Sequence, residues 1–249
     1  MKIYLGSREL RPEGFKTLDI SPEHHPDIVA DITHMPQIAD DSCSEVAASH
    51  VLEHLAWPDS FAALAEMARI LRCGGILRLA VPDLRLLAEM LCRGENPFFC
   101  VGMAYGNGGN KKIDCHHFGF TADMLLDILT SLGFDDFDWW NSTLPEGANG
   151  WSRSGEERIA ISLNVKAVKK QEPLLPAEAI RAKLEEFPMR EYHAVLAEML
   201  GSTVPRTAIN SVKFYQRLHF KLIEAEQRIA YLENELKRFQ TAGSGEAHG

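Results

Sequence analysis

The pattern of hydrophobic positions across residues 46–83 predicts a strand, a helix and a second strand. A short apolar run at 46–48 comes first, and apolar residues on one helical face follow: Phe61, Leu64, Met67, Ala68 and Leu71. The glycine pair at 74–75 is expected to end this helix. Residues 76–81 are continuously apolar, as in a strand buried on both faces, and Pro82 closes the run. Ligands normally bind where the strands of such a unit end.

Short apolar runs and amphipathic segments alternate along the first two thirds of the chain, which predicts a mostly parallel sheet. Strands are expected at residues 2–6, 16–20, 28–32, 45–50, 76–82, 137–140 and 159–168. Helices are expected from about residue 60, at 84–93 and at 121–132, and a loop rich in glycine and asparagine at 102–112. Thr121 is the expected N-cap of the last helix, and Gly133 its expected stop. Only residues 7–15 separate the first two strands, so a turn is expected there in place of a helical crossover.

The composition changes after Lys170. Prolines 173 and 176 suggest a linker, and helical stretches are expected at 177–186 and 190–200, within a helical linker region spanning 171–208. Apolar residues then recur at alternating spacings of four and three: Leu218, Leu222, Ala225, Ile229, Leu232, Leu236 and Phe239. This heptad pattern predicts a coiled coil over 209–240 that joins copies of the chain into a homo-oligomer. The alternative is a lone amphipathic helix folded back on its own domain. Residues 241–249 are predicted to be disordered.

The composition is that of a soluble enzyme. The chain has 249 residues, of which 45% are hydrophobic, enough for one α/β domain with a buried core and an appendage. A net charge of −9 disfavours binding to nucleic acid or to an anionic membrane surface. No apolar stretch is long enough for a membrane span, and no signal peptide is recognisable. The five cysteines form no CxxC pair and are expected to be free thiols in a reducing cytoplasm.

Two segments carry a resemblance to a known family. SHVLEHL (49–55) and ILRCGGILRLAVPDL (70–84) resemble the fourth strand, its helix and the fifth strand of class I S-adenosylmethionine (SAM)-dependent methyltransferases, with Cys73 in place of the usual proline. The order of elements resembles that family over residues 1–170, and most of all its small predicted methyltransferases often linked to polysaccharide biosynthesis. The resemblance implies an α/β Rossmann-like fold with a mostly parallel seven-stranded sheet, an antiparallel last strand and, here, a C-terminal helical extension. It also implies S-adenosyl-L-methionine as the cofactor.

The resemblance assigns cofactor contacts to residues at the strand ends. Gly6 ends the first strand, where the backbone must approach the cofactor closely. Asp19 ends the second strand and is positioned like the acid that binds ribose hydroxyls in nucleotide-binding Rossmann folds. Asp31 and Ile32, which end the third strand, resemble the pair that holds the adenine. Each carboxylate alone could equally be a cap or a turn residue.

Ser49 and His50 follow the fourth strand and are expected beside the reactive end of the cofactor. The first loop, however, departs from the family. It reads Gly6-Ser7-Arg8-Glu9, whereas the family usually carries GxG there, and the next glycine is Gly14. This departure supports an alternative hypothesis, in which the chain is a non-catalytic methyltransferase-like scaffold or regulatory subunit that recruits partners.

The segment DCHHFGF (114–120) resembles the family's Asp-x-His-x-x-Gly-Phe motif. By this resemblance His116 is the general base that takes the proton of an oxygen acceptor, and Asp114 orients it. His117 has no counterpart in the motif. The alternative is that this segment only anchors a loop over the cleft.

His50, Glu53 and His54 form H-x-x-E-H, which superficially matches a zinc-protease motif. It lies within the segment that the methyltransferase resemblance covers, and no third ligand can be named, so we assign no metal ligand. A structural role is expected for His54, such as a hydrogen bond to a loop carbonyl. A weaker metal alternative exists, because some methyltransferases similar to this one use a Glu-His pair here to hold a divalent ion beside a catechol-like substrate.

The expected activity is SAM-dependent O-methylation of a small-molecule or saccharide-like acceptor. No motif encodes the acceptor itself, because loops of variable shape build acceptor pockets.

Overall fold

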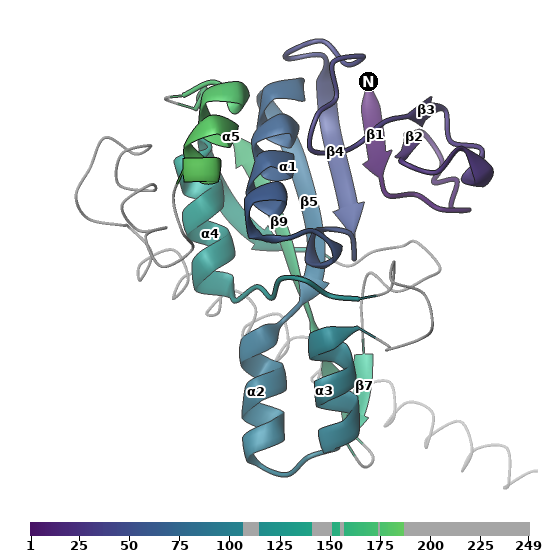
Figure 1. Cartoon of the computed structure of the whole chain (residues 1–249), viewed down its shortest axis with the longest axis vertical. Helices are drawn as coiled ribbons and strands as arrows, with labels where there is room; N and C mark the ends of the chain where they lie inside the picture. Colours follow the sequence, from purple (N-terminus) through teal and green to yellow (C-terminus); the bar gives the residue numbers. More distant parts are fainter. Residues whose placement is uncertain (107–114, 141–150, 155–156, 174, 187–249) are drawn as a thin grey trace, which may run out of the picture.

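The computed structural model describes residues 1–106, 115–140, 151–154, 157–173 and 175–186. Seven strands form one sheet in the order β3-β2-β1-β4-β5-β9-β6 (Figure 1). They are β1 (Lys2–Leu5), β2 (Lys16–Asp19), β3 (Ile28–Val29), β4 (Cys43–Ser49), β5 (Leu71–Pro82), β6 (Phe134–Trp139) and β9 (Ser162–Lys169). The pairs from β3 across to β5 are parallel, and β9 runs antiparallel to both β5 and β6. The predicted mostly parallel sheet with an antiparallel last strand is therefore confirmed.

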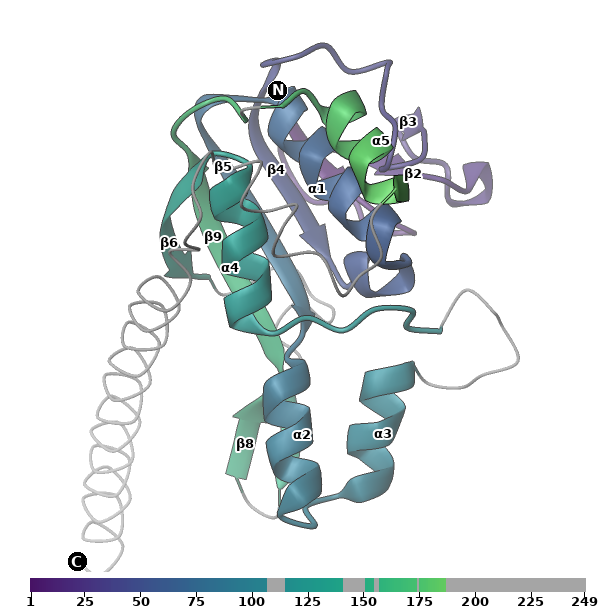
Figure 2. The ribbon, with the colours of Figure 1, turned by 60° about the vertical axis from the view of Figure 1, so that its left-hand side comes forward.

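Helices α1 (Trp57–Ile70), α4 (Ala122–Ser131) and α5 (Ala177–Glu186) lie on one face of this sheet (Figure 1 and Figure 2). Beyond the carboxyl end of β5, α2 (Leu84–Cys92) and α3 (Pro97–Tyr105) pack against each other. Two short 3-10 helices, η1 (Pro22–His24) and η2 (Leu52–His54), follow β2 and β4. A separate antiparallel pair, β7 (Trp151–Ser154) and β8 (Glu157–Ala160), is absent from the sequence-based prediction.

The apolar face predicted for the first helix is buried. Phe61, Leu64, Met67 and Ala68 are each 1% exposed or less, and they share one core with the inward-facing residues of β1, β4 and β5. Helix α5 packs on α1 and adds Ile180 to this core. The helix predicted at 177–186 is thus confirmed, and it packs on the first domain although it follows the proline-rich linker.

The prediction that Gly74 and Gly75 end the first helix is wrong. Helix α1 ends at Ile70, and β5 begins at the next residue, so both glycines lie within the strand. The register of β5 against β4 shifts at this place. Gly74 has φ +78°, and a Cβ at Gly75 would lie 2.8 Å from the carbonyl oxygen of Arg72. The two glycines therefore accommodate an irregularity of the strand. Gly74 adopts the positive φ, and Gly75 has no side chain to clash with the Arg72 carbonyl.

Other local predictions have mixed outcomes. Thr121 caps α4, since its hydroxyl accepts from the Met124 amide at 3.4 Å, and Gly133 follows the helix with φ +86°. The segment between β1 and β2 is a turn without a helix, as predicted. The loop predicted from residue 102 is wrong in its first part, because α3 continues to Tyr105.

The predicted helix at 190–200, the coiled coil over 209–240 and the tail at 241–249 lie outside the described residues. Among the residues described, none of the helices combines the length and apolar character needed to cross a membrane.

Candidate functional site

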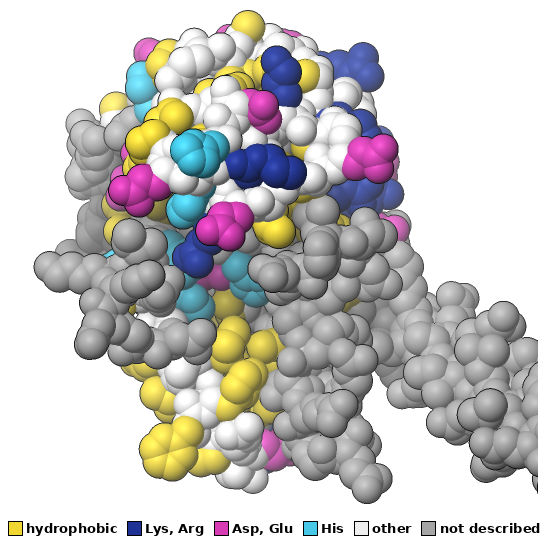
Figure 3. Space-filling view, turned by 90° about the vertical axis from the view of Figure 1, so that its right-hand side faces the viewer, with side chains coloured by type: hydrophobic (Ala, Val, Ile, Leu, Met, Phe, Trp, Pro, Cys, Tyr) yellow, Lys and Arg dark blue, Asp and Glu magenta, His cyan; other side chains and the backbone are white. Residues whose placement is uncertain are grey.

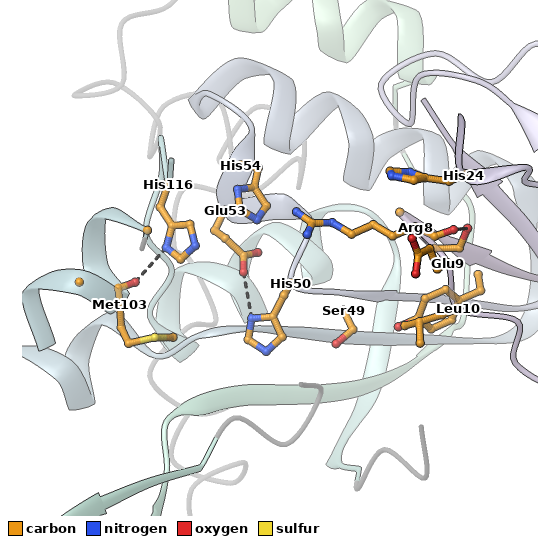
Figure 4. A pocket seen from close by; sticks show the side chains of 15 residues that line it. Arg8, Glu9, Leu10, His24, Ser49, His50, Glu53, His54, Met103 and His116 are labelled. Atoms are coloured by element: carbon orange, nitrogen blue, oxygen red, sulfur yellow. Dashed lines mark hydrogen bonds and ion pairs between the residues drawn. The ribbon is translucent and has the colours of Figure 1, made fainter. Parts of the chain in front are cut away.

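A cavity of about 680 Å³ lies where β1 and β4 end at their carboxyl ends (Figure 4). Its volume falls in the range of roughly 300–1,000 Å³ that is typical of small-molecule sites. One wall, the turn end, consists of residues 6–10 after β1. The opposite wall, the histidine end, consists of His50, Glu53, His54 and His116. Figure 3 shows several histidine side chains gathered on this side of the molecule.

Gly6 is required by the packing of the turn end. It has φ +63°, its amide donates to the Leu18 carbonyl oxygen at 2.8 Å, and a Cβ would lie 2.3 Å from Cγ2 of Val51. The side chain of Arg8 extends from this turn toward the histidine end (Figure 4). The loop therefore brings charged side chains, those of Arg8 and Glu9, to this wall of the cavity.

Asp19 is 5% exposed and does not line the cavity. Its Oδ2 accepts from the Arg8 amide at 2.7 Å, and its Oδ1 accepts from the Ser21 amide at 2.9 Å and lies 3.2 Å from Nδ1 of His24. Burial alone would raise the pKa of Asp19, but the Ser21 and Arg8 amides and His24 together outweigh it and hold the pKa below its ordinary value. The carboxylate thus fixes the turns that follow β1 and β2.

Asp31 and Ile32 also lie outside the cavity lining. Asp31 Oδ1 accepts from the amide and the hydroxyl of Thr33, both at 2.8 Å, which is the geometry of a turn-stabilising aspartate. Ile32 is 8% exposed and belongs to the core. Of the six predicted cofactor residues, the structure brings Gly6, Ser49 and His50 together around the cavity and leaves the other three outside it.

His50 and Glu53 are hydrogen-bonded at the histidine end. His50 Nδ1 lies 2.9 Å from Glu53 Oε1, and the Ser162 hydroxyl lies 2.9 Å from His50 Nε2. Glu53 is 1% exposed, and its Oε2 has no hydrogen-bond partner among the described residues. The sequence predicts neither Ser162 as a partner nor a buried role for Glu53.

His54 and His116 each bond a backbone carbonyl. His54 Nδ1 is 3.1 Å from the Cys115 oxygen, which confirms the loop-carbonyl contact predicted for this residue. His116 Nδ1 is 2.8 Å from the Met103 oxygen, in α3. The two rings meet edge to face with centroids 5.0 Å apart. Burial lowers the pKa of His116, and this effect exceeds the opposing one of Glu53. Asp114, its predicted partner, lies outside the described residues.

The H-x-x-E-H motif does not form the helix that a zinc protease requires. Its last residues make the three-residue η2, and both ring nitrogens of His50 are engaged with Glu53 and Ser162. The structure therefore gives no support to a protease site built on His50 and His54.

Comparison with known proteins adds a family match. Residues 10–79 match the sequence profile of a family described as "Methyltransferase domain". The match supports an enzyme of the SAM-dependent methyltransferase kind, with S-adenosyl-L-methionine as its cofactor. No curated protein matches the chain significantly.

Solved structures with a similar fold include three SAM-dependent methyltransferases. The one from Methanosarcina mazei is 16% identical, with 69% of this chain and 92% of that chain covered and a TM-score of 0.47. The one from Thermotoga maritima is 17% identical, with 68% and 82% covered and a TM-score of 0.44. The one from Archaeoglobus fulgidus is 15% identical, with 68% and 85% covered and a TM-score of 0.44.

Proposed function

We propose that the chain transfers a methyl group from S-adenosyl-L-methionine to an oxygen of a small or saccharide-like acceptor. The observation that carries this proposal is the cavity of about 680 Å³ at the carboxyl ends of β1 and β4. Side chains of both strand ends line it, as a ligand site in an open α/β sheet requires. The match of residues 10–79 to a methyltransferase domain supports the same reaction class.

The cavity fits the cofactor in part. Gly6, Ser49 and His50 line it and would hold the cofactor, which supplies an electrophilic methyl group when bound. Asp19 acts indirectly in this proposal, because its carboxylate oxygens already accept hydrogen bonds from the turns. It positions the wall that Arg8 and its neighbours form. The adenine contacts of Asp31 and Ile32 stay predictions from the sequence.

The histidine end faces the acceptor in this proposal. Methyl transfer forms a carbon–oxygen bond as the carbon–sulfur bond breaks, and the hydroxyl proton of the acceptor must leave. His116 can take that proton at Nε2, because its Nδ1–H is donated to the Met103 carbonyl. The lowered pKa keeps the ring neutral, and so able to accept a proton, at neutral pH. The orientation of this ring by Asp114 stays a prediction.

Two observations favour the second candidate function, a non-catalytic scaffold. The acid expected to bind the ribose is committed to backbone amides, and charged side chains of the turn end line the cavity. Both features would follow if the fold were retained without its cofactor.

Calorimetric titration of the full chain with SAM and with S-adenosylhomocysteine separates the two candidates. We expect one equivalent of ligand to bind, and a Ser49→Trp variant, which fills the cavity, to lose that binding. Ser44→Trp is the matched control, since Ser44 lies at the other end of β4 and away from the cavity. Absence of binding at millimolar ligand to a folded protein, or equal binding by both variants, would refute the proposal and favour the scaffold.

A further inference from the structure

Three side chains at the histidine end form a potential metal site. Glu53, His54 and His116 each offer one ligand atom, and these atoms lie within 4.8 Å of one another. An ion held at about 2.0–2.2 Å by each ligand needs separations of at most about twice that distance, so small side-chain rotations would complete the site. Figure 4 shows both rings and the carboxyl group at the same end of the cavity.

The hydrogen bonds of the two histidines leave one nitrogen of each ring available. A carbonyl oxygen can only accept, so Nδ1 of His54 donates to Cys115 and Nδ1 of His116 donates to Met103. In the neutral rings both Nε2 atoms then carry a free lone pair. Backbone carbonyls commonly fix the tautomer of metal-binding histidines in this way.

Glu53 supplies a second and independent observation. Its side chain is almost fully buried, His50 binds its Oε1, and its Oε2 meets no hydrogen-bond donor among the described residues. A buried carboxylate oxygen without a donor is costly, and a bound cation removes that cost. His50 thus holds one oxygen of the carboxylate, and the carboxylate lies beside the two rings.

We propose that Glu53, His54 and His116 bind one divalent transition-metal ion at the histidine end of the cavity. Two imidazoles and one carboxylate suit Zn²⁺, Co²⁺, Mn²⁺ or Fe²⁺, whereas Mg²⁺ and Ca²⁺ prefer oxygen ligands. All three residues line the cavity, so the remaining coordination positions face it, as in catalytic sites. Arg8 reaches toward the cluster from the opposite wall (Figure 4).

The ion can bind whether or not the chain is a methyltransferase. Its role in the reaction, however, rests on the proposed function. With the ion bound, His116 is a ligand and no longer the base. An acceptor hydroxyl at an open position would lose its proton to solvent more readily, because a bound divalent ion lowers its pKa. The site would then favour acceptors that can reach the ion through an oxygen.

The test uses the full chain after treatment with a chelator and dialysis. Titration with Zn²⁺ in a calorimeter and with Co²⁺ in a visible spectrometer should each show one equivalent bound. Glu53→Gln and His116→Ala are expected to weaken Zn²⁺ binding at least 10-fold. His117→Ala is the matched control, because this neighbouring histidine is exposed and outside the cluster. No binding, or binding that Glu53→Gln and His116→Ala leave unchanged, would overturn the proposal.

Two further measurements keep the test decisive. If circular dichroism shows that a variant does not fold, X-ray absorption of the zinc-loaded natural chain replaces the titration of that variant. Two imidazole ligands are then expected, and a shell without imidazole would contradict the site. Titration of the metal-loaded protein with SAM separates this proposal from the function: a chain that binds Zn²⁺ but not SAM refutes only the methyltransferase, and a chain that binds SAM but not Zn²⁺ refutes only the metal site.

Discussion

The two ends of the cavity each depend on a buried carboxylate, and the two carboxylates are satisfied to different degrees. Asp19 lies outside the cavity lining but supports the turn end, and it accepts hydrogen bonds from two backbone amides. Glu53 at the histidine end receives one hydrogen bond, from His50, and its second oxygen has none among the described residues. A buried acceptor without a donor costs about 1–3 kcal/mol. The carboxylate that supports the turn end is therefore fully engaged, whereas the one at the histidine end keeps an oxygen for the proposed ion.

The difference follows from the length of the first loop. A helical crossover would satisfy most of its own amides internally, but the turn between β1 and β2 leaves amides such as that of Arg8 in need of an acceptor. Asp19 supplies it. The carboxylate that the sequence predicts to bind ribose is therefore part of the local backbone structure.

The largest expected effect comes from Gly6 at the turn end, where a Cβ would meet the side chain of Val51. We expect Gly6→Ala to lower the free energy of unfolding by roughly 2–5 kcal/mol. About 1–2 kcal/mol comes from the left-handed conformation and about 1–3 kcal/mol from the clash with Val51. Urea unfolding followed by circular dichroism measures this loss.

Gly102→Ala is the control for this prediction. Gly102 lines the same cavity but lies within α3, and a Cβ there would meet nothing within 4 Å. Alanine should leave stability unchanged or raise it by up to about 1 kcal/mol. If both glycine variants lost equal stability, Gly6 would have no special conformational role.

A smaller effect is expected from Asp19. Asp19→Ala leaves the Arg8 and Ser21 amides without their acceptor and should lower the free energy of unfolding by about 1–3 kcal/mol. The pKa of Asp19 is lower in the folded state, so its contribution is present above the ordinary value of 3.8 and is lost as the pH falls through the lowered pKa. The natural chain should therefore have a higher free energy of unfolding than Asp19→Asn at pH 7, and this difference should shrink on acidification.

Glu9→Ala provides the comparison for Asp19→Ala. Glu9 is an exposed carboxylate of the same turn, and its removal should change the free energy of unfolding by less than about 0.5 kcal/mol. Equal losses in the two variants would mean that the turn end does not depend on the buried carboxylate. Urea unfolding curves at pH 7 and near pH 3 give the free energies of unfolding of the natural chain and of each variant.

The sequence predicts the sheet and its main helices because their signals are local. The apolar face of α1, the Thr121 cap and the Gly133 stop each require only neighbouring residues. The glycine pair at 74–75 misleads because glycine marks an unusual backbone conformation without saying whether a helix ends or a strand bulges.

The site is less predictable because its contacts join distant positions. His50 meets Ser162, 112 positions later, and His54 meets Cys115, 61 positions later. A motif shows which side chains are present, but folding decides which atoms remain free. The same holds for Asp19, whose role depends on the backbone that the short loop places beside it.

The smallest expected effect is the most informative about the histidine end. In chelator-treated protein, Glu53→Gln should change the free energy of unfolding by no more than about 1 kcal/mol, and an increase is the expected sign. The amide oxygen can still accept from His50, and the amide NH₂ can donate to the free nitrogens of the two neighbouring rings.

Glu66→Gln is the matched comparison, because Glu66 is also buried but both its oxygens have donors, from Arg69 and the Met35 amide. It should lose about 1.5–3 kcal/mol, as expected for hydrogen bonds to a charged group. The opposite ranking in urea unfolding would show that the Glu53 carboxylate is already satisfied without a ligand, and the contrast between the two ends of the cavity would disappear.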